Sequence, residues 1–192
     1  MLRSTLLVVS AFASSAFALI HGVDSATLVS TATYAKARSE GFTKAVIRGY
    51  EEACGVGGEV DPNFVPSYHN ARAAGFTNID TYWFPCNGAG HNCKSYANQL
   101  SELAATFRAN SMNIGTIWID IEKDSAICNN VRLNHSVQSI SDDDTSFQWN
   151  YGSGGNLAQA RQLIAAIRAS GFKYGIYSSP GVRPFVLFAS AY

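Results

Sequence analysis

Residues 73–84 read Ala-Ala-Gly-Phe-Thr-Asn-Ile-Asp-Thr-Tyr-Trp-Phe, and they join the end of a helix-like stretch to a strand-like run. Glycine suits the left-handed residue that follows a helix, where a Cβ atom would be strained. The same pattern recurs at 39–50 and at 169–177, with Gly41-Phe42 and Gly171-Phe172 at the joints. The repetition predicts helices that alternate with strands entering the core.

Four further elements extend this alternation. Strands are expected over 21–25 and 115–122, and helices over 94–108 and 156–170, where apolar residues recur at helical spacing. Asn156 is the predicted N-cap of the last helix. The resulting order, β-α-β-α-β-α-β-α-β, predicts an α/β fold with a parallel sheet under helical cover. Both a doubly wound sheet and a (β/α) barrel satisfy this order.

The composition is that of an ordinary globular protein. Of the 192 residues, 47% are apolar and 15% are charged, which is too apolar and too little charged for a disordered chain. The 14 Lys and Arg residues balance 14 Asp and Glu residues, so no basic excess exists to neutralise phosphates. We therefore expect no nucleic-acid partner and no stable membrane association.

The first 18 residues have the features of a secretory signal peptide. Arg3 supplies the positive start, residues 6–12 form a short apolar run, and Ala16-Phe17-Ala18 is a small-x-small cleavage site. The alternative is a transmembrane anchor, but the apolar run is shorter than the roughly 20 residues that a spanning helix needs. The sequence therefore predicts a secreted, extracellular protein.

The cysteines of the chain are Cys54, Cys86, Cys93 and Cys128. An even number in a secreted chain predicts disulfides. Cys86 and Cys93 are close enough to close a small loop, which favours this pair among the three connectivities. The alternative is a zinc site formed by His91 with Cys86 and Cys93, although this spacing is not that of a zinc finger or ribbon.

The strongest candidate for chemistry is the run Ile117-Trp118-Ile119-Asp120-Ile121-Glu122. Residues two apart on a strand face the same side, so Asp120 and Glu122 share a face. They come last in an apolar strand, at the end where parallel α/β sheets and barrels bind ligands. The alternative is that both are solvated loop acids or caps of the next helix.

Four other residues lie near the carboxyl ends of predicted strands. Asp24 ends the first strand and is either a third site carboxylate or a helix cap. Tyr82 and Tyr177 are either sugar-stacking aromatics or core residues. Arg48 is a candidate substrate-binding residue that pairs with the site acids, or else a partner in a structural ion pair.

Together these residues resemble glycoside hydrolase family 25, the lysozymes (N-acetylmuramidases) with a modified (β/α) barrel. The resemblance runs from His21 to about Pro180, excluding residues 131–148. The segments that carry it are Gly22-Val23-Asp24-Ser25, Ile47-Arg48-Gly49-Tyr50, Asp61-Pro62-Asn63, Asn70-Ala71-Arg72-Ala73-Ala74-Gly75, Asp80-Thr81-Tyr82-Trp83-Phe84-Pro85-Cys86, Ile117-Trp118-Ile119-Asp120-Ile121-Glu122 and Gly175-Ile176-Tyr177-Ser178. Each segment alone is modest, but their order and spacing are specific.

The resemblance implies cleavage of the β-1,4 bond between N-acetylmuramic acid and N-acetylglucosamine in peptidoglycan glycan strands. It implies that Glu122 is the general acid and that Asp120 stabilises the developing positive charge, directly or by orienting the substrate's acetamido group. It implies that Asp24 assists and that Tyr82 and Tyr177 line the sugar site. It implies no metal and no cofactor, and we expect a monomer.

The same resemblance implies an incomplete TIM-like barrel. The family barrel has about eight strands, whereas five strand-like runs are found here, so the last strands are missing. We predict one catalytic domain over 19–180, an anomalous insertion over 131–148 and an aberrant tail over 181–192. Both segments include a Val-Arg pair, at 131 and at 182, whose codons can hold an intron start, and we hypothesise two retained introns. Sequencing the transcript across these codons checks that hypothesis.

Missing barrel strands leave other functions open. One is a secreted carbohydrate-binding module that keeps part of the sugar groove but has no turnover. Another is a product that does not fold, and a third is a secreted α/β hydrolase with a different substrate.

Overall fold

The computed structural model of the chain describes residues 20–53, 55–88, 92–122, 149 and 151–178. Its elements in chain order are β1 (Gly22–Ser25), α1 (Thr31–Ser39), β2 (Lys44–Glu51), β3 (Glu59–Val60), α2 (Phe64–Ala73), β4 (Asn78–Trp83), α3 (Tyr96–Ala109), β5 (Ile117–Ile121), α4 (Gly152–Ser170) and β6 (Tyr174–Ser178). The predicted signal peptide, the segment 131–148 and the tail 181–192 lie outside the described residues, as do Cys54, His91 and Cys128.

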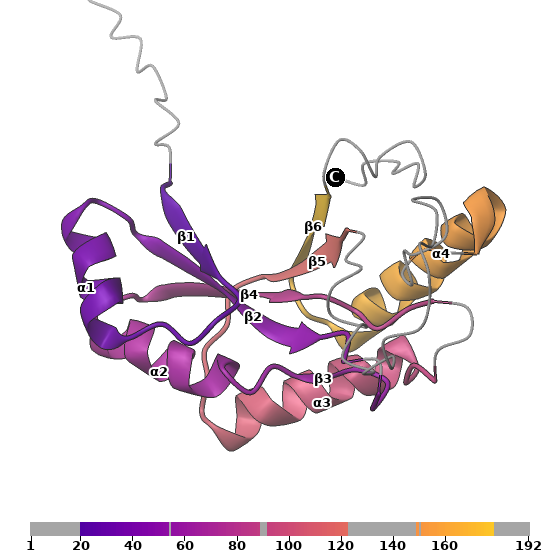
Figure 1. Cartoon of the computed structure of the whole chain (residues 1–192), viewed down its shortest axis with the longest axis horizontal. Helices are drawn as coiled ribbons and strands as arrows, with labels where there is room; N and C mark the ends of the chain where they lie inside the picture. The colour runs from indigo at the N-terminus through magenta and orange to yellow at the C-terminus, as the bar shows by residue number, and fades with distance from the viewer. Residues whose placement is uncertain (1–19, 54, 89–91, 123–148, 150, 179–192) are drawn as a thin grey trace, which may run out of the picture.

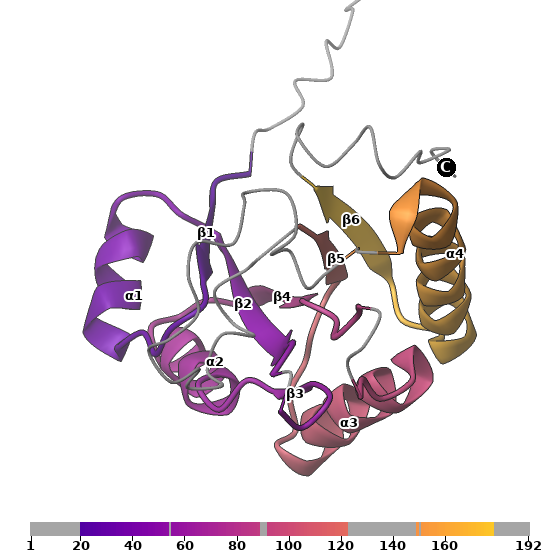
Figure 2. The same cartoon turned by 45° about the vertical axis from the view of Figure 1, so that its right-hand side comes forward.

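Five strands form a parallel sheet in the order β1-β2-β4-β5-β6, and β3 pairs with β2 in the antiparallel direction. Figures 1 and 2 show helices α1 to α4 in an arc along one side of the curved sheet. A doubly wound sheet would carry helices on both faces, whereas a sequential strand order under one-sided helices is typical of a (β/α) barrel. The predicted α/β class with a parallel sheet is confirmed, and the described strands are compatible with an incomplete TIM-like barrel.

The repeated glycine marks a helix end each time it occurs. Gly41, Gly75 and Gly171 have φ angles of 95°, 92° and 74°, in the left-handed region that glycine adopts without strain. The chain then turns back toward the sheet, and the backbone N–H of Phe76 donates to the carbonyl oxygen of Ala71 in the helix that has just ended. The predicted helix-to-strand joints are therefore present at all three places.

The core lies between the sheet and the helices. Buried residues alternate with partly exposed ones along β5 and along most of β2. The apolar stripe predicted over 94–108 is buried on α3 and packs against this core. The largest fully buried side chains include Ile47, Phe64, Ile79, Trp83, Leu103, Ile117, Ile119, Ile121 and Leu163.

Two details differ from the sequence prediction. Strand β3 was not predicted, because two residues are too few to show a strand period. The predicted N-cap at Asn156 is wrong, because α4 begins at Gly152. The Asn156 side-chain oxygen instead accepts a hydrogen bond from the Tyr151 backbone N–H at 3.1 Å, from within the first turns. The run Gly-Ser-Gly-Gly disfavours a helix by propensity, but tertiary contacts between α4 and α3 override it, including Tyr96 Oη donating to Gln159 Oε1 at 2.8 Å.

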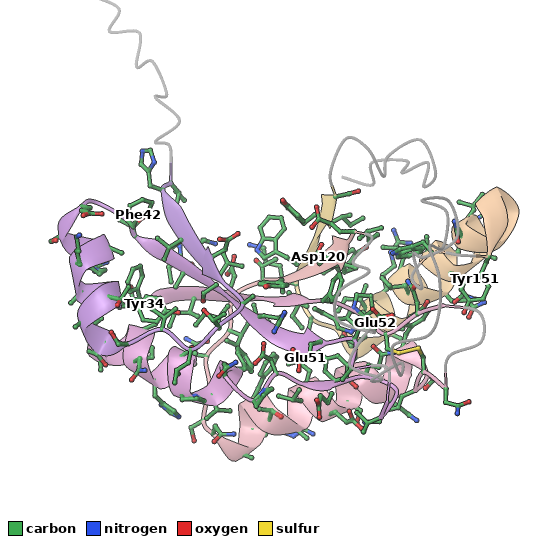
Figure 3. All side chains as sticks on the ribbon, viewed as in Figure 1. Tyr34, Phe42, Glu51, Glu52, Asp120 and Tyr151 are labelled. Carbon is green, nitrogen blue, oxygen red and sulfur yellow. A yellow bond between two sulfur atoms is a disulfide. The ribbon has the colours of Figure 1, made fainter. Side chains whose placement is uncertain are left out.

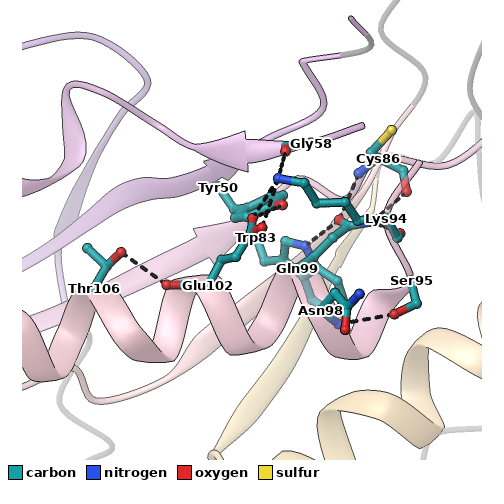
Figure 4. A network of polar contacts seen from close by, with 10 residues as sticks. All are labelled: Tyr50, Gly58, Trp83, Cys86, Lys94, Ser95, Asn98, Gln99, Glu102 and Thr106. Atoms are coloured by element: carbon teal, nitrogen blue, oxygen red, sulfur yellow. Dashed lines mark hydrogen bonds and ion pairs between the residues drawn. The ribbon is translucent and has the colours of Figure 1, made fainter. Parts of the chain in front are cut away.

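Buried Gln99 joins the end of β4 to α3 (Figure 4). Its side-chain oxygen accepts from Trp83 Nε1 at 3.2 Å and from the Cys86 N–H at 3.0 Å. Its side-chain amide donates to the carbonyl oxygens of Cys86 at 2.9 Å and Lys94 at 2.8 Å. The predicted Cys86–Cys93 disulfide is present beside this contact. It removes the two thiolates that the zinc alternative required.

A charged contact fixes the neighbouring end of β2 (Figure 4). Lys94 Nζ lies 2.8 Å from a Glu102 carboxylate oxygen and donates to the Gly58 carbonyl oxygen at 2.9 Å. The Tyr50 hydroxyl on β2 donates to Glu102 at 2.8 Å. The carboxyl ends of β2 and β4, which face the same edge of the sheet, are therefore both attached to α3.

Candidate functional site

A pocket with a cavity volume of about 380 Å³ lies toward the carboxyl ends of the parallel strands. Each of the five parallel strands contributes to it. It is lined by Asp24 from β1, Val46 from β2, Tyr82 from β4, Trp118 and Asp120 from β5, Glu122 directly after β5, and Tyr177 from β6. The structure thus brings together five of the six residues that the sequence proposed for the site.

The alternation of β5 explains why carboxylates and core come from one strand. Ile117, Ile119 and Ile121 are buried against the helices, whereas Asp120 is partly exposed on the opposite face, and so is Glu122 beyond the strand. Figure 3 places Asp120 near the end of β5, on the face of the sheet opposite α2 and α3. The two-residue repeat of the strand therefore places the isoleucines in the core and the carboxylates in the pocket.

The pocket carboxylates act electrostatically on Tyr177. Tyr177 is 55% exposed, and the negative charge of Glu122 is the largest cause that raises its pKa above the ordinary value. Burial is the next cause, and the charges of Asp120 and Asp24 raise the pKa further. A phenolate would repel these charges, so the hydroxyl keeps its proton to higher pH.

We expect Glu122→Gln to lower the pKa of Tyr177 toward the ordinary value for tyrosine, because the main repulsive charge is removed. The measurement is a pH titration of ¹³C-labelled tyrosine by NMR, with the Tyr177 resonance assigned by its loss in Tyr177→Phe. Glu40→Gln, at an exposed position of the α1 end, is the control and should leave the titration unchanged. An unchanged pKa in Glu122→Gln would contradict the placement of these two side chains.

Arg48 is the sixth proposed residue and does not line the pocket. Its Nε donates to Asp61 Oδ2 at 2.5 Å, and its Nη2 lies 2.7 Å from Glu51 Oε2. Burial opposes the charge of Arg48, but the hydrogen bond and the negative charges of Asp61 and Glu51 outweigh it and raise the pKa of Arg48. The observed contacts of Arg48 are therefore those of a structural ion pair, the alternative that the sequence left open. Its positive charge still reaches Tyr82, its register partner on β4.

Burial is the main cause that raises the pKa of Tyr82. The charge of Arg48 opposes this effect, and those of Asp120 and Asp24 add to it. The phenol therefore stays a neutral hydroxyl that can donate a hydrogen bond beside the pocket acids.

Sequence reasoning missed Trp118 and Val46 as pocket residues. The pattern that could have found Trp118 is the alternation already used, since Trp118, Asp120 and Glu122 are spaced two apart. Val46 is the register partner of Asp24 on β1, so it follows from the strand pairing, which the sequence alone did not provide.

Within the described part of the chain, no group of three or more His, Cys, Asp or Glu side chains is arranged to hold a metal ion. The described helices also include none with the length and apolarity needed to cross a membrane. The fold and the site together define an α/β protein with a parallel sheet, compatible with an incomplete barrel, and an acidic, aromatic-lined pocket toward the carboxyl ends of its strands.

Comparison with known proteins specifies the family. The sequence model described as "Lysozyme-like protein 1" matches residues 15–181. The chain belongs to this lysozyme-like family. It is also similar to proteins named as glycoside hydrolase family 25 lysozymes, as the sequence resemblance implied. A search of solved structures found no match.

Three relatives illustrate the similarity. Lysozyme-like protein 5 of Caenorhabditis elegans is 32% identical over 168 residues, covering 88% of this chain and 65% of the relative. Probable GH family 25 lysozyme 2 of Dictyostelium discoideum is 29% identical over 160 residues, covering 83% and 61%. Probable GH family 25 lysozyme 4 of the same organism is 31% identical over 141 residues, covering 73% and 52%. The chain thus spans between about half and two thirds of the length of these curated relatives.

Proposed function

We propose that the chain is a lysozyme-type glycoside hydrolase that cleaves the β-1,4 bond between N-acetylmuramic acid and N-acetylglucosamine in bacterial peptidoglycan. The observation that carries the proposal is the pocket, in which three carboxylates and three aromatic side chains meet at the strand ends. Carboxylates are the groups with which glycosidases protonate the leaving oxygen and stabilise positive charge at the sugar carbon. Aromatic rings bind the apolar faces of sugars. The family membership supports the same reaction class.

In this proposal Glu122 is the general acid. Its proton passes to the glycosidic oxygen while the bond from that oxygen to C1 breaks, and the bonding electron pair stays with the oxygen. Asp120 stabilises the positive charge that develops at C1, or orients the substrate's acetamido group so that its carbonyl oxygen attacks C1. A water molecule then completes the hydrolysis and returns a proton to Glu122. Asp24 assists as a third negative charge in the pocket.

The sugar itself would be bound by the aromatic side chains. Tyr82 and Tyr177 lie on either side of β5 in the sheet order, so they flank the two acids. Arg48, beside Tyr82 in the strand register, remains a proposed substrate-binding residue at the edge of this site.

The experiment is digestion of purified peptidoglycan with the full chain, followed by mass spectrometry of the newly formed reducing ends. We expect reducing ends of N-acetylmuramic acid. Reducing ends of N-acetylglucosamine would contradict the proposed bond, and an unchanged glycan would contradict hydrolysis.

A second candidate function is glycan binding without turnover. It is favoured by the exposure of the last described strand, where Ile176 and Tyr177 are 37% and 55% exposed. Binding of peptidoglycan by Glu122→Gln together with no lysis by the wild-type chain would support this candidate.

We also propose that the protein is secreted, on the basis of residues 1–18. Expression in a eukaryotic host should then yield a protein in the medium whose N-terminal sequence starts at Leu19. A protein that stays in the cells with Met1 in place would contradict secretion.

A further inference from the structure

A fourth carboxylate lies on the pocket side of the sheet, deeper along β4 than the pocket residue Tyr82. Asp80 alternates on β4 with Tyr82, so the two side chains share a face. Asp80 lies two residues deeper along β4 than Tyr82, which pairs with Trp118, and its own register partner Val46 lines the pocket. Asp80 is only 1% exposed and does not line the pocket. It is therefore a buried acid directly beneath a pocket wall.

Both oxygens of Asp80 accept hydrogen bonds from the neighbouring strands. Oδ1 accepts from the Thr116 backbone N–H at 3.0 Å. Oδ2 accepts from Lys44 Nζ at 2.6 Å and from Trp118 Nε1 at 2.9 Å. A Cβ atom on Gly115 would lie 2.6 Å from Oδ1, so the chain approaches this carboxylate as closely as glycine allows. The carboxylate is thus fixed by β2 and by the start of β5.

The opposite side of the Trp118 ring is fixed by β6. Gly175 is the register partner of Trp118, and a Cβ atom on it would lie 2.5 Å and 2.6 Å from two ring carbons. The indole therefore lies against the bare backbone of Gly175 while its N–H is held by Asp80. These two contacts restrict the conformation of the indole ring. Trp118 lines the pocket that also contains Asp120 and Glu122.

We propose that Asp80, paired with Lys44, is a positioning residue that fixes the Trp118 indole as the sugar-facing floor of the pocket. This inference rests on the proposed function, because the ligand is the glycan that the pocket acids would act on. The apolar face of a pyranose ring would stack on the indole. Trp118 is two residues deeper along β5 than Asp120, so a fixed indole sets the depth at which a sugar meets the two acids.

The pairing with Lys44 explains how Asp80 can stay charged while buried and hold the Trp118 indole. An unpaired buried charge is strongly unfavourable, whereas a paired one with satisfied hydrogen bonds is tolerated. Lys44 is 22% exposed on its side chain and lies at the start of β2, so its ammonium group neutralises Asp80 from below. The third donor to Asp80, the indole, then gains a charge-assisted hydrogen bond that a neutral acceptor would not supply.

The test uses the full chain labelled with ¹⁵N-tryptophan, which has three tryptophans and so three indole N–H resonances. The Trp118 resonance is assigned by its loss in Trp118→Phe. Glycan binding is measured with a soluble tetrasaccharide of alternating N-acetylglucosamine and N-acetylmuramic acid, in the Glu122→Gln background so that the ligand is not consumed.

In Asp80→Asn we expect the Trp118 resonance to move upfield and the tetrasaccharide to bind about tenfold more weakly. An amide offers one acceptor oxygen, so it cannot serve both Thr116 and Trp118. The matched control is Asp61→Asn, which removes an equally buried carboxylate charge paired with a cation of β2, and it should leave the Trp118 resonance in place. If Asp80→Asn does not fold, the double variant Lys44→Met with Asp80→Asn removes both charges together and should give the same two changes.

A Trp118 resonance that stays in place without the Asp80 carboxylate overturns the inference, and so does an unchanged affinity when the resonance has moved. The proposed function is tested separately, by binding of the tetrasaccharide to Glu122→Gln with Asp80 intact and by cleavage with the wild-type chain. Binding without any cleavage by the wild-type chain removes hydrolysis and leaves the inference standing. Absence of binding removes the sugar-facing role of Trp118 together with the proposed function.

Discussion

Replacing Glu122 by Gln is expected to lower the rate of peptidoglycan hydrolysis by about 10²- to 10⁴-fold, the contribution typical of a positioned general acid. The amide keeps the size and most hydrogen bonds of the carboxyl group, but it has no proton to give to the leaving oxygen. The measurement is the rate of release of reducing ends from purified peptidoglycan at saturating substrate.

Two comparisons make this result specific. Glu40→Gln is the same chemical change on an exposed turn after α1, so the rate should stay at the wild-type value. The affinity of Glu122→Gln for the glycan should change much less than its rate, since the acid acts mainly in the transition state. A loss of binding equal to the loss of rate would argue that Glu122 has a structural or binding role instead.

Replacing Ile119 by Ala is expected to lower the free energy of unfolding by about 2–5 kcal/mol, because it deletes a completely buried side chain and leaves a cavity. Ile176 is its register partner on β6 and is 37% exposed. Ile176→Ala is therefore a matched control in the same pair of strands, and we expect it to lower stability by well under half as much. The measurement is urea unfolding followed by circular dichroism.

Equal losses of unfolding free energy in the two variants would contradict the finding that Ile119 on β5 is buried whereas Ile176 on β6 is partly exposed. A change in the slope of the unfolding curve would mean that the denatured or native state had changed in compactness. The comparison of midpoints is therefore made between variants that share one slope.

Much of the fold could be predicted from the sequence because its information is local. The glycine after each helix and the apolar run after it identify three helix-to-strand joints without any knowledge of the partner strands. The start of α4 could not be predicted, because Gly-Ser-Gly-Gly favours a turn, whereas the tertiary contacts of α4 and of the preceding Tyr151 depend on the assembled fold. Strand β3 exists only as the partner of β2, so two residues carried no pattern of their own.

Most of the candidate site could also be predicted from the sequence. Asp120 and Glu122 share a face by alternation, and strand ends place Asp24, Tyr82 and Tyr177 at one edge of the sheet. The partners of Arg48 were not predictable, because Asp61 reaches it from the segment that follows β3. The contact of Asp80 with Trp118 likewise depends on which strands are neighbours, and that is a property of the assembled sheet.

The pocket takes one wall from every parallel strand, and its first and last contributors are Asp24 and Tyr177. Such a site exists only while β6 remains docked, although β6 is a strand with exposed apolar residues at the edge of the described sheet. Local separation of β6 from β5 would remove one wall of the pocket, while the core under α2 and α3 stayed intact. Ligand occupancy and the docking of β6 are therefore linked equilibria, and a bound glycan should slow amide hydrogen exchange in β6 more than in β2.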